Sequence, residues 1–175
     1  MKLTDILKQI REKASYPKHA DFAQQSLYET YSIISEILDA EDAYQHQTVG
    51  KGIWSYTDQS GEEYYVRLAY VPNLSSDEEG YLELKTYWMK DGKPQYSDIK
   101  PDSSTIDLHK RSNTVAKIFR DEVIPFFRSQ QLTKAIKIFP IDKVRYRLSK
   151  IMVKKYCPSD FKIIYLDNRI EIIKP

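Results

Sequence analysis

The sequence has 175 residues, of which 41% are apolar and 30% are charged, and this composition excludes a disordered chain. The length fits one domain that buries roughly 70% of the surface exposed in its unfolded chain. The net charge is only +2, but residues 1–107 carry 11 basic and 19 acidic side chains (−8), whereas residues 108–175 carry 16 and 6 (+10). The second part therefore predicts a basic surface, unless these charges only solvate the fold or attract its acidic part.

Targeting and redox features predict a cytoplasmic protein. The N-terminus alternates charged and apolar residues and lacks the apolar core of a secretion signal. No apolar run is long enough to span a bilayer, so we expect no membrane association. The single cysteine, Cys157, excludes an internal disulfide and predicts an inert thiol near a helix end. The three histidines are scattered without ligand or triad spacing, so we expect no metal.

The first part of the chain predicts two helices followed by three strands. Apolar residues recur at helical spacing over 4–13 and about 20–38, and we expect these helices, within residues 1–45, to pack on a sheet. Residues 41–47 are polar and predict a loop. Alternating patterns then predict strands over 53–56, 63–71 and 81–89, the first two joined by a turn that ends in a glycine.

The second part predicts alternating helices and strands. Residues 93–110 show little periodicity and predict a long connection, followed by a helix that Ser112 or Asn113 caps and that runs to about Arg128. Pro125 predicts a kink or an early end of this helix at Ile124. We then expect, in order, a strand, a helix capped by Asp142 and a hairpin: 135–139, 142–156 and 161–173. Without repeats or a linker, this pattern predicts one α+β domain.

The last predicted helix has one apolar side and one basic side. Four cations at spacings i, i+4, i+7 and i+11 fall within an arc of roughly 60°, and we call them the basic row: Lys143, Arg147, Lys150 and Lys154. Such a row suits an anionic partner, either a nucleic acid, through its backbone phosphates, or an acidic protein. Three other cations are candidate extensions of the row: Arg111, Arg120 and Arg128.

The order of these elements, α-α-β-β-β-α-β-α-β-β, resembles that of the acetyl-CoA-dependent N-acetyltransferase (GNAT) superfamily. The resemblance covers about residues 1–173 but lacks that family's first strand. It implies a mixed sheet flanked by helices and an acyl-CoA-dependent N-acyltransferase, with acetyl-CoA or another acyl-CoA as cofactor. It also implies a V-shaped cleft between the strands at 81–89 and 135–139, which admits the pantetheine arm of the cofactor.

In that family the central helix begins with a loop of pattern Arg/Gln-x-x-Gly-x-Gly/Ala, whose backbone amides hold the cofactor pyrophosphate. Here the stretch 111–116 reads RSNTVA, in which Arg111 and Ala116 match and Thr114 replaces a glycine. A β-branched residue at that place crowds a phosphate and restricts the backbone. The resemblance implies cofactor contacts from six residues, which a plain helix cap explains equally well: Lys110, Arg111, Ser112, Asn113, Thr114 and Ala116.

The resemblance also implies catalytic residues. Glu83, on the strand at 81–89, is the candidate general base that removes a proton from an attacking amine, although a solvated strand residue is the simpler interpretation. On the last helix, Ser149 stands where the family's catalytic tyrosine usually sits, and Val153 replaces a glycine. Tyr146 is the candidate substitute acid, but helical geometry turns it towards solvent. These departures leave a non-enzymatic binding module, which uses the basic row, as the alternative to a transferase.

Overall fold

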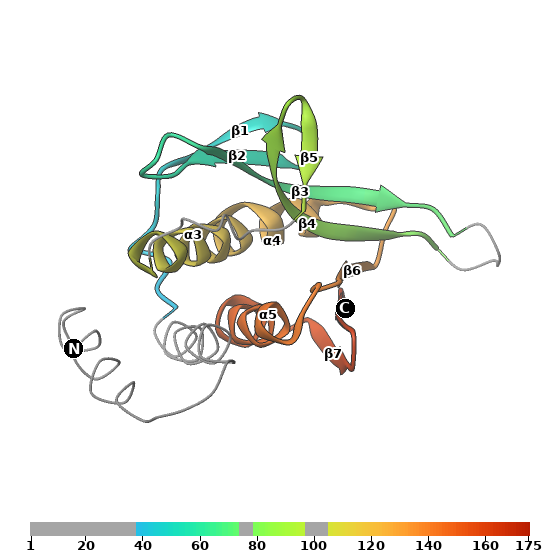
Figure 1. Cartoon of the computed structure of the whole chain (residues 1–175). Helices are drawn as coiled ribbons and strands as arrows, with labels where there is room; N and C mark the ends of the chain where they lie inside the picture. Colours follow the sequence, from blue (N-terminus) through green and yellow to red (C-terminus); the bar gives the residue numbers. More distant parts are fainter. Residues whose placement is uncertain (1–37, 74–78, 97–104) are drawn as a thin grey trace, which may run out of the picture. The chain divides into compact units, whose positions relative to one another are not determined.

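The computed structural model describes residues 38–73, 79–96 and 105–175, all within one compact unit, Leu38–Pro175. Except for Leu38, the predicted helices at 4–13 and about 20–38 lie outside the described residues, so their packing on the sheet stays a prediction. Within the described part the chain is α+β, as predicted, with one mixed sheet and helices packed against it (Figure 1).

The sheet of the described part has eight strands in the order β1-β2-β3-β4-β6-β8-β7, with the short β5 paired to β4. The strands are β1 (His46–Gly50), β2 (Ile53–Thr57), β3 (Glu63–Val71), β4 (Tyr81–Lys90), β5 (Lys93–Gln95), β6 (Ala135–Ile138), β7 (Lys162–Leu166) and β8 (Arg169–Ile173). All pairs are antiparallel except β4 and β6, which are parallel. The sequence therefore predicted β2, β3, β4, β6 and the final hairpin, but it missed β1 and β5.

Helical segments connect the strands of the second part of the chain. They are α3 (Thr105–Ile118), the π-helical η1 (Phe119–Val123), α4 (Ile124–Ser129) and α5 (Lys143–Tyr156). The first three are continuous, and the π-helical turn directly precedes Pro125, whose ring and missing N–H disturb the preceding turn. The helix thus changes its hydrogen-bonding pattern near Ile124 without ending there.

The predicted connection over 93–110 is wrong at both of its ends. Asp91 and Gly92 both have positive φ angles, 50° and 74°, so the chain reverses tightly and Lys93–Gln95 returns as β5. At the other end, α3 already begins at Thr105, seven residues before the predicted cap at Ser112. The strand β5 was missed because its three residues, one of them a proline, are too few to show a periodic pattern. Residues 97–104 of this connection lie outside the described part.

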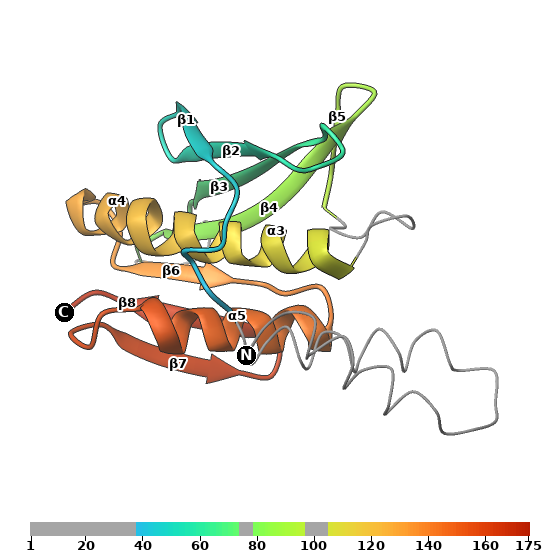
Figure 2. The ribbon, with the colours of Figure 1, turned by 90° about the vertical axis from the view of Figure 1, so that its left-hand side faces the viewer.

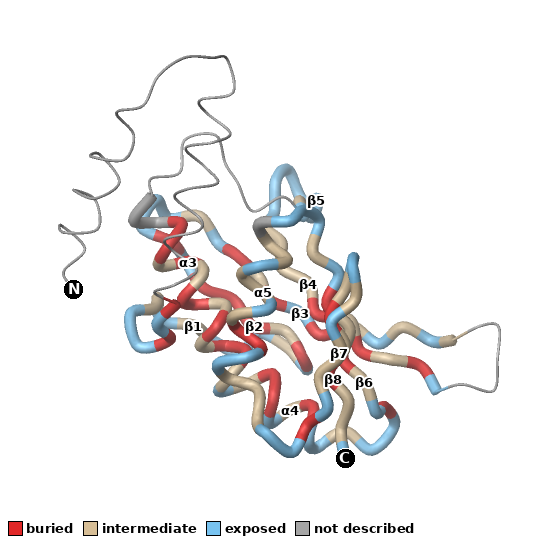
Figure 3. Tube along the Cα trace, turned by 90° about the horizontal axis from the view of Figure 1, so that it is seen from below, coloured by how far each residue is buried: buried red, intermediate tan, exposed pale blue. Residues whose placement is uncertain are grey.

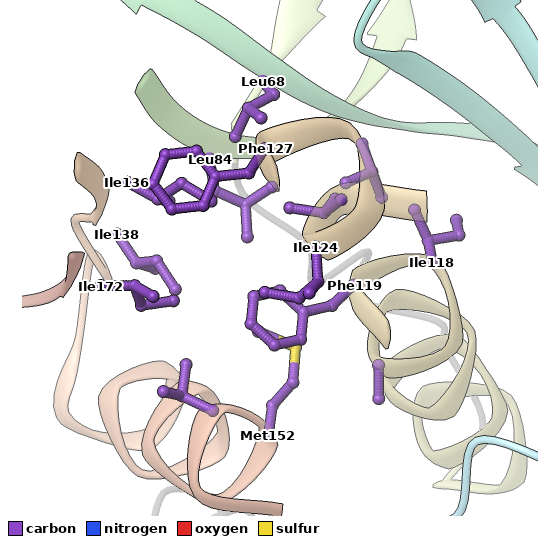
Figure 4. Close-up of a cluster of buried hydrophobic side chains, with 14 of the residues drawn as sticks. Leu68, Leu84, Ile118, Phe119, Ile124, Phe127, Ile136, Ile138, Met152 and Ile172 are labelled. Carbon is purple, nitrogen blue, oxygen red and sulfur yellow. The ribbon is translucent and has the colours of Figure 1, made fainter. Parts of the chain in front are cut away.

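One face of the sheet is buried under the helices. The register places Leu82 beside Ile136 and Leu84 beside Ile138, with Ile172 and Ile170 next on β8. Figure 4 shows the side chains of these strands pointing towards Phe119 and Phe127 of the long helix and Met152 of α5. Figure 2 shows α3–α4 and α5 on the same side of the sheet. Burial of this one apolar face is the main driving force for the fold.

The other face of the sheet carries the alternate residues of the same strands, and no described helix covers it. We call it the open face, and its central side chains are Tyr65, Arg67, Tyr81, Glu83, Lys85, Tyr87 and Lys137. Figure 3 shows how the buried residues follow the inner sides of the helices and the central strands, whereas the tip of the β4–β5 hairpin is exposed.

The parallel pair β4–β6 is short. It runs from Leu82–Ile136 to Leu84–Ile138, after which β6 ends and β4 continues. Trp88 pairs with Tyr64 on one side and with Gln95 on the other, so β5 lies on the same edge of β4 as β6. The two strands predicted to enclose a cleft are thus paired over three residues, and their pairing stops where β6 ends at Ile138.

Candidate functional site

The basic row lies on the outer side of α5. Asp142 caps this helix as predicted, since its carboxylate accepts the N–H of Arg145 at 2.8 Å. Met152 and Val153 anchor the inner side in the core, which turns the opposite side towards solvent. Lys143, Arg147, Lys150 and Lys154 are all exposed there. At about 1.5 Å of rise per residue, the row is about 16 Å long.

The basic row differs from Arg120 and Arg128 because, among the described residues, no carboxylate neutralises it. Arg120 pairs with Glu41 at 2.6 Å, and Arg128 pairs with Asp160 at 2.8 Å. None of the four row residues forms an ion pair within the described ranges, and Lys150 only lies 5.0 Å from the ring centroid of Tyr165. The row is therefore positive charge that is available to an anion.

The candidate extensions of the row do not join it. Arg111 is buried, and its Nη1 donates a hydrogen bond of 2.5 Å to the Tyr64 hydroxyl. Arg120 donates to the carboxylates of Asp121 and Glu41, which raise its pKa, and Arg128 is held by Asp160. None of these three candidates therefore extends the basic row.

The predicted pyrophosphate cradle at 110–116 is wrong, because these residues lie inside α3 and not at its start. Backbone N–H groups in a helix interior are bonded to the carbonyls four residues earlier, so they cannot face a phosphate. Among the side chains, Arg111, Asn113, Thr114 and Ala116 are buried, and Ser112 donates to Leu108 O at 2.9 Å. The residues predicted to hold acyl-CoA therefore do not fit it.

The buried polar residues of α3 hold the chain segment that enters the sheet. The Asn113 side chain accepts the N–H of Asp39 and donates to Asp42 O, both at 2.9 Å. Thr114 Oγ1 accepts the N–H of Tyr44 at 2.8 Å and donates to Lys110 O at 2.7 Å. Unpaired buried polar groups are unfavourable, so these bonds fix residues 39–44 on α3. The motif that suggested a phosphate site is a structural polar seam.

The candidate catalytic residues lie on opposite faces of the sheet. Glu83 belongs to the open face, where Lys85 Nζ contacts its carboxylate at 3.1 Å. Tyr146 belongs to α5, which covers the buried face, and its ring packs against the core instead of facing solvent as predicted. The structure therefore does not bring the candidate acid, Tyr146, and the candidate base, Glu83, together on one surface.

Two further observations concern chemistry and membranes. Within the described ranges, no group of three or more His, Cys, Asp or Glu side chains could hold a metal ion. Among the helices that the structure describes, none is both long enough and apolar enough to span a bilayer.

The chain was also compared with known proteins. No protein-family model matches the sequence. No curated protein matches it either.

Sequence analysis missed two features of this region. Alternation along β3 puts Tyr65 and Arg67 on one face of their strand, but it does not reveal that Tyr87 and Lys137 lie on the same side of the sheet. The polar seam was also missed, because Asn113 and Thr114 have the same side chains whether they cap a helix or bond to a distant backbone segment.

His109 makes the stability of the polar seam depend on pH. Burial lowers the pKa of His109 from its ordinary 6.5, and Asp42 and Asp39 oppose this effect. The neutral ring accepts a hydrogen bond from Asn113 Nδ2 at 3.2 Å. The unfolded chain takes up this proton at a higher pH than the folded chain, so the free energy of unfolding should fall as the pH drops below about 6.5.

Urea denaturation above and below about pH 6.5 measures this loss. The His109→Gln variant stays neutral at every pH, so its two urea midpoints should lie closer together than those of the natural chain. An identical pH dependence in both chains would contradict the role of His109.

Cys157 should react slowly as a nucleophile. Burial raises the pKa of its thiol to about 11, with a further contribution from Asp160 and an opposing one from Arg128. Near neutral pH the thiolate is then about a hundredfold rarer than in an ordinary cysteine. Iodoacetamide should alkylate the folded chain about a hundredfold more slowly than the urea-unfolded chain, as followed by mass spectrometry. Equal rates in the two states would refute the inert thiol.

Proposed function

We propose that this chain is a GNAT-like protein that works as a non-enzymatic binding module for nucleic acid. The observation that carries the proposal is the basic row, four exposed cations on one side of α5 without an ion pair among the described residues. An acidic protein partner would use the same charges.

Two observations support the GNAT-like part of the proposal. After the added β1, the described elements follow the order that the resemblance implies, with β5 as an insertion between the third strand of that order and the long helix. The parallel strands β4 and β6 are neighbours paired over only three residues, and they are the two strands between which that family admits the pantetheine arm. The resemblance therefore concerns the arrangement of the elements and does not extend to the site residues.

The non-enzymatic part rests on the residues that the resemblance assigned. Buried side chains and helical hydrogen bonds occupy the stretch 110–116, and Glu83 and Tyr146 lie on different faces of the sheet. General acid–base catalysis needs both groups within hydrogen-bonding reach of one substrate. Binding does not need this arrangement, because phosphates are attracted by charge and tolerate variation in the sequence that carries them.

The choice of nucleic acid rests on the geometry of the row. A nucleic-acid backbone presents closely and regularly spaced charges, about one per 3.4 Å of axis on each strand of a duplex. A straight row about 16 Å long therefore meets several phosphates at once. Folded proteins rarely present such a regular line of negative charge, since their acidic side chains are usually mixed with basic ones.

The absence of the cofactor cradle predicts that the chain does not bind acyl-CoA. Isothermal titration calorimetry with acetyl-CoA and with CoA should give no heat of binding up to millimolar ligand. An active N-acetyltransferase in the same buffer is the positive control. A measurable affinity would show that another part of the chain holds the cofactor, and it would restore the transferase hypothesis.

The basic row predicts salt-dependent binding to a short fluorescein-labelled DNA duplex. With four phosphate contacts, the logarithm of the association constant should fall with the logarithm of salt concentration with a slope of about −3 to −4. The double variant Lys150→Glu/Lys154→Glu removes two contacts, so the slope should become about −2 and the affinity should drop. Fluorescence anisotropy at several salt concentrations measures both quantities.

The matched control is the double variant Lys51→Glu/Lys90→Glu. It changes the net charge by the same amount but reverses two exposed lysines on other elements, a turn after β1 and the end of β4. This variant should retain most of the affinity. Equal losses in the two double variants would refute the basic row as the binding site. Binding to an acidic peptide without binding to the duplex would assign the row to an acidic protein.

A further inference from the structure

The open face of the sheet carries an unusual group of aromatic rings. Tyr65 and Tyr87 are stacked, with ring centroids 5.1 Å apart and planes within 8°, and Tyr96 follows at 5.9 Å from Tyr87. Further along β4, Tyr81 lies 6.3 Å from Phe139, which is 38% exposed. None of these rings belongs to the core cluster of the buried face. The open face therefore presents flat aromatic surface that solvent can reach.

The charges of the open face leave it positive. Lys85 neutralises Glu83 at 3.1 Å, and Glu171 accepts from Arg169 at 2.7 Å and lies 3.7 Å from Lys137. The remaining acid of this face, Glu63, accepts the hydroxyl of Tyr65 at 2.7 Å. Each carboxylate of the open face thus has a hydrogen-bond or ion-pair partner on the same face. The exposed Arg67 and Lys162, in contrast, form no ion pair within the described ranges. The positive charge of Arg67 and Lys162 therefore remains to attract anions.

A pocket lies at the end of the open face next to Tyr81. Its lining includes Tyr81, Lys137 and Glu171 of the open face, together with the polar residues Asn73, Glu79 and Lys134. Lys137 Nζ lies 4.4 Å from the ring centroid of Tyr81. The pocket has a volume of about 460 Å³, which falls in the range of sites for small organic ligands. An aromatic ring beside an ammonium group suits a planar base and its phosphate.

We propose that the open face binds single-stranded nucleic acid. Unpaired bases stack on Tyr65 and Tyr96, the outer rings of a row with Tyr87 in its middle, the pocket beside Tyr81 takes one nucleotide, and Arg67 and Lys137 contact phosphates. A duplex does not fit this surface, because its bases are already stacked on one another and cannot lie on side-chain rings. An acidic peptide would use the cations but has no need of the exposed ring faces. This surface goes beyond the proposed function, since it lies on the side of the sheet opposite to α5.

The test uses fluorescence anisotropy of the full chain with a fluorescein-labelled single-stranded oligouridylate. The Tyr87→Ala variant should bind it about tenfold more weakly or worse, because it removes the middle ring that holds Tyr65 and Tyr96 in place for stacking with the bases. The control is Tyr70→Ala, which removes a 58% exposed tyrosine from the other face of β3 and should bind as the natural chain does. Thermal denaturation verifies that both variants fold.

A second variant keeps the test decisive if Tyr87→Ala does not fold. Lys137→Gln leaves every ring in place and should weaken binding to the oligouridylate several-fold while it reduces the salt dependence by about one contact. Natural affinity in the folded variants, or no binding by the natural chain, would overturn the inference. Dimerisation through this face, detected by sedimentation and lost in Tyr87→Ala without any oligouridylate binding, would also overturn it.

The two proposals, binding by the basic row and binding by the open face, can be refuted independently of each other. The Lys150→Glu/Lys154→Glu chain should still bind oligouridylate, and a further Tyr87→Ala change should then remove that binding. If the α5 variant alone abolishes it and Tyr87→Ala has no effect, all binding belongs to the basic row and the open-face inference is overturned. If oligouridylate binding persists when the duplex does not bind at all, the open face stands without the proposed function.

Discussion

The fold depends on a short parallel ladder between β4 and β6. In the described part, the strands of residues 46–95 and those of residues 135–173 are joined into one sheet by only three residue pairs, from Leu82–Ile136 to Leu84–Ile138. So short a ladder contributes few hydrogen bonds, and the two parts are held together chiefly by the long helix α3–η1–α4. Phe119, Val123 and Phe127 of this helix are fully buried in the core that both parts share. Topology and packing thus depend on one another at this junction.

This junction also brings the acidic and basic parts of the chain together. Glu41 with Arg120 and Glu79 with Lys134 link an acid of the first part to a cation of the second part on the surface. Internal attraction therefore accounts for some of the charge asymmetry of the sequence. It does not involve the basic row, because none of the four row residues forms an ion pair within the described ranges. Surface pairs of this kind contribute little to stability, so the fold does not depend on them.

The strands and helices with strong periodic patterns could be predicted from the sequence, whereas the site could not. Glu63–Val71 alternates over nine residues and Asp142 caps α5, so both signals are local. The polar seam of α3 depends on tertiary contacts, because Asn113 and Thr114 bond to backbone groups about 70 residues earlier in the chain. A polar residue that is buried by distant contacts has no local signature that separates it from a helix cap. The predicted cradle was misplaced for this reason.

The open face could not be predicted from the sequence either, because it is formed by residues of several strands. Each strand of the sheet reveals in its own sequence which residues share a face, but the register between strands depends on turns and on the parallel crossover. Tyr65 meets Tyr87 because the β3–β4 hairpin pairs them directly, and Lys137 reaches Glu83 and Tyr81 only through the crossover after the long helix. Rings that look like ordinary strand formers in the sequence therefore become one continuous surface in the fold. Five of the described tyrosines lie in or against the core, namely Tyr44, Tyr56, Tyr64, Tyr146 and Tyr156, whereas those of the open face lie outside it.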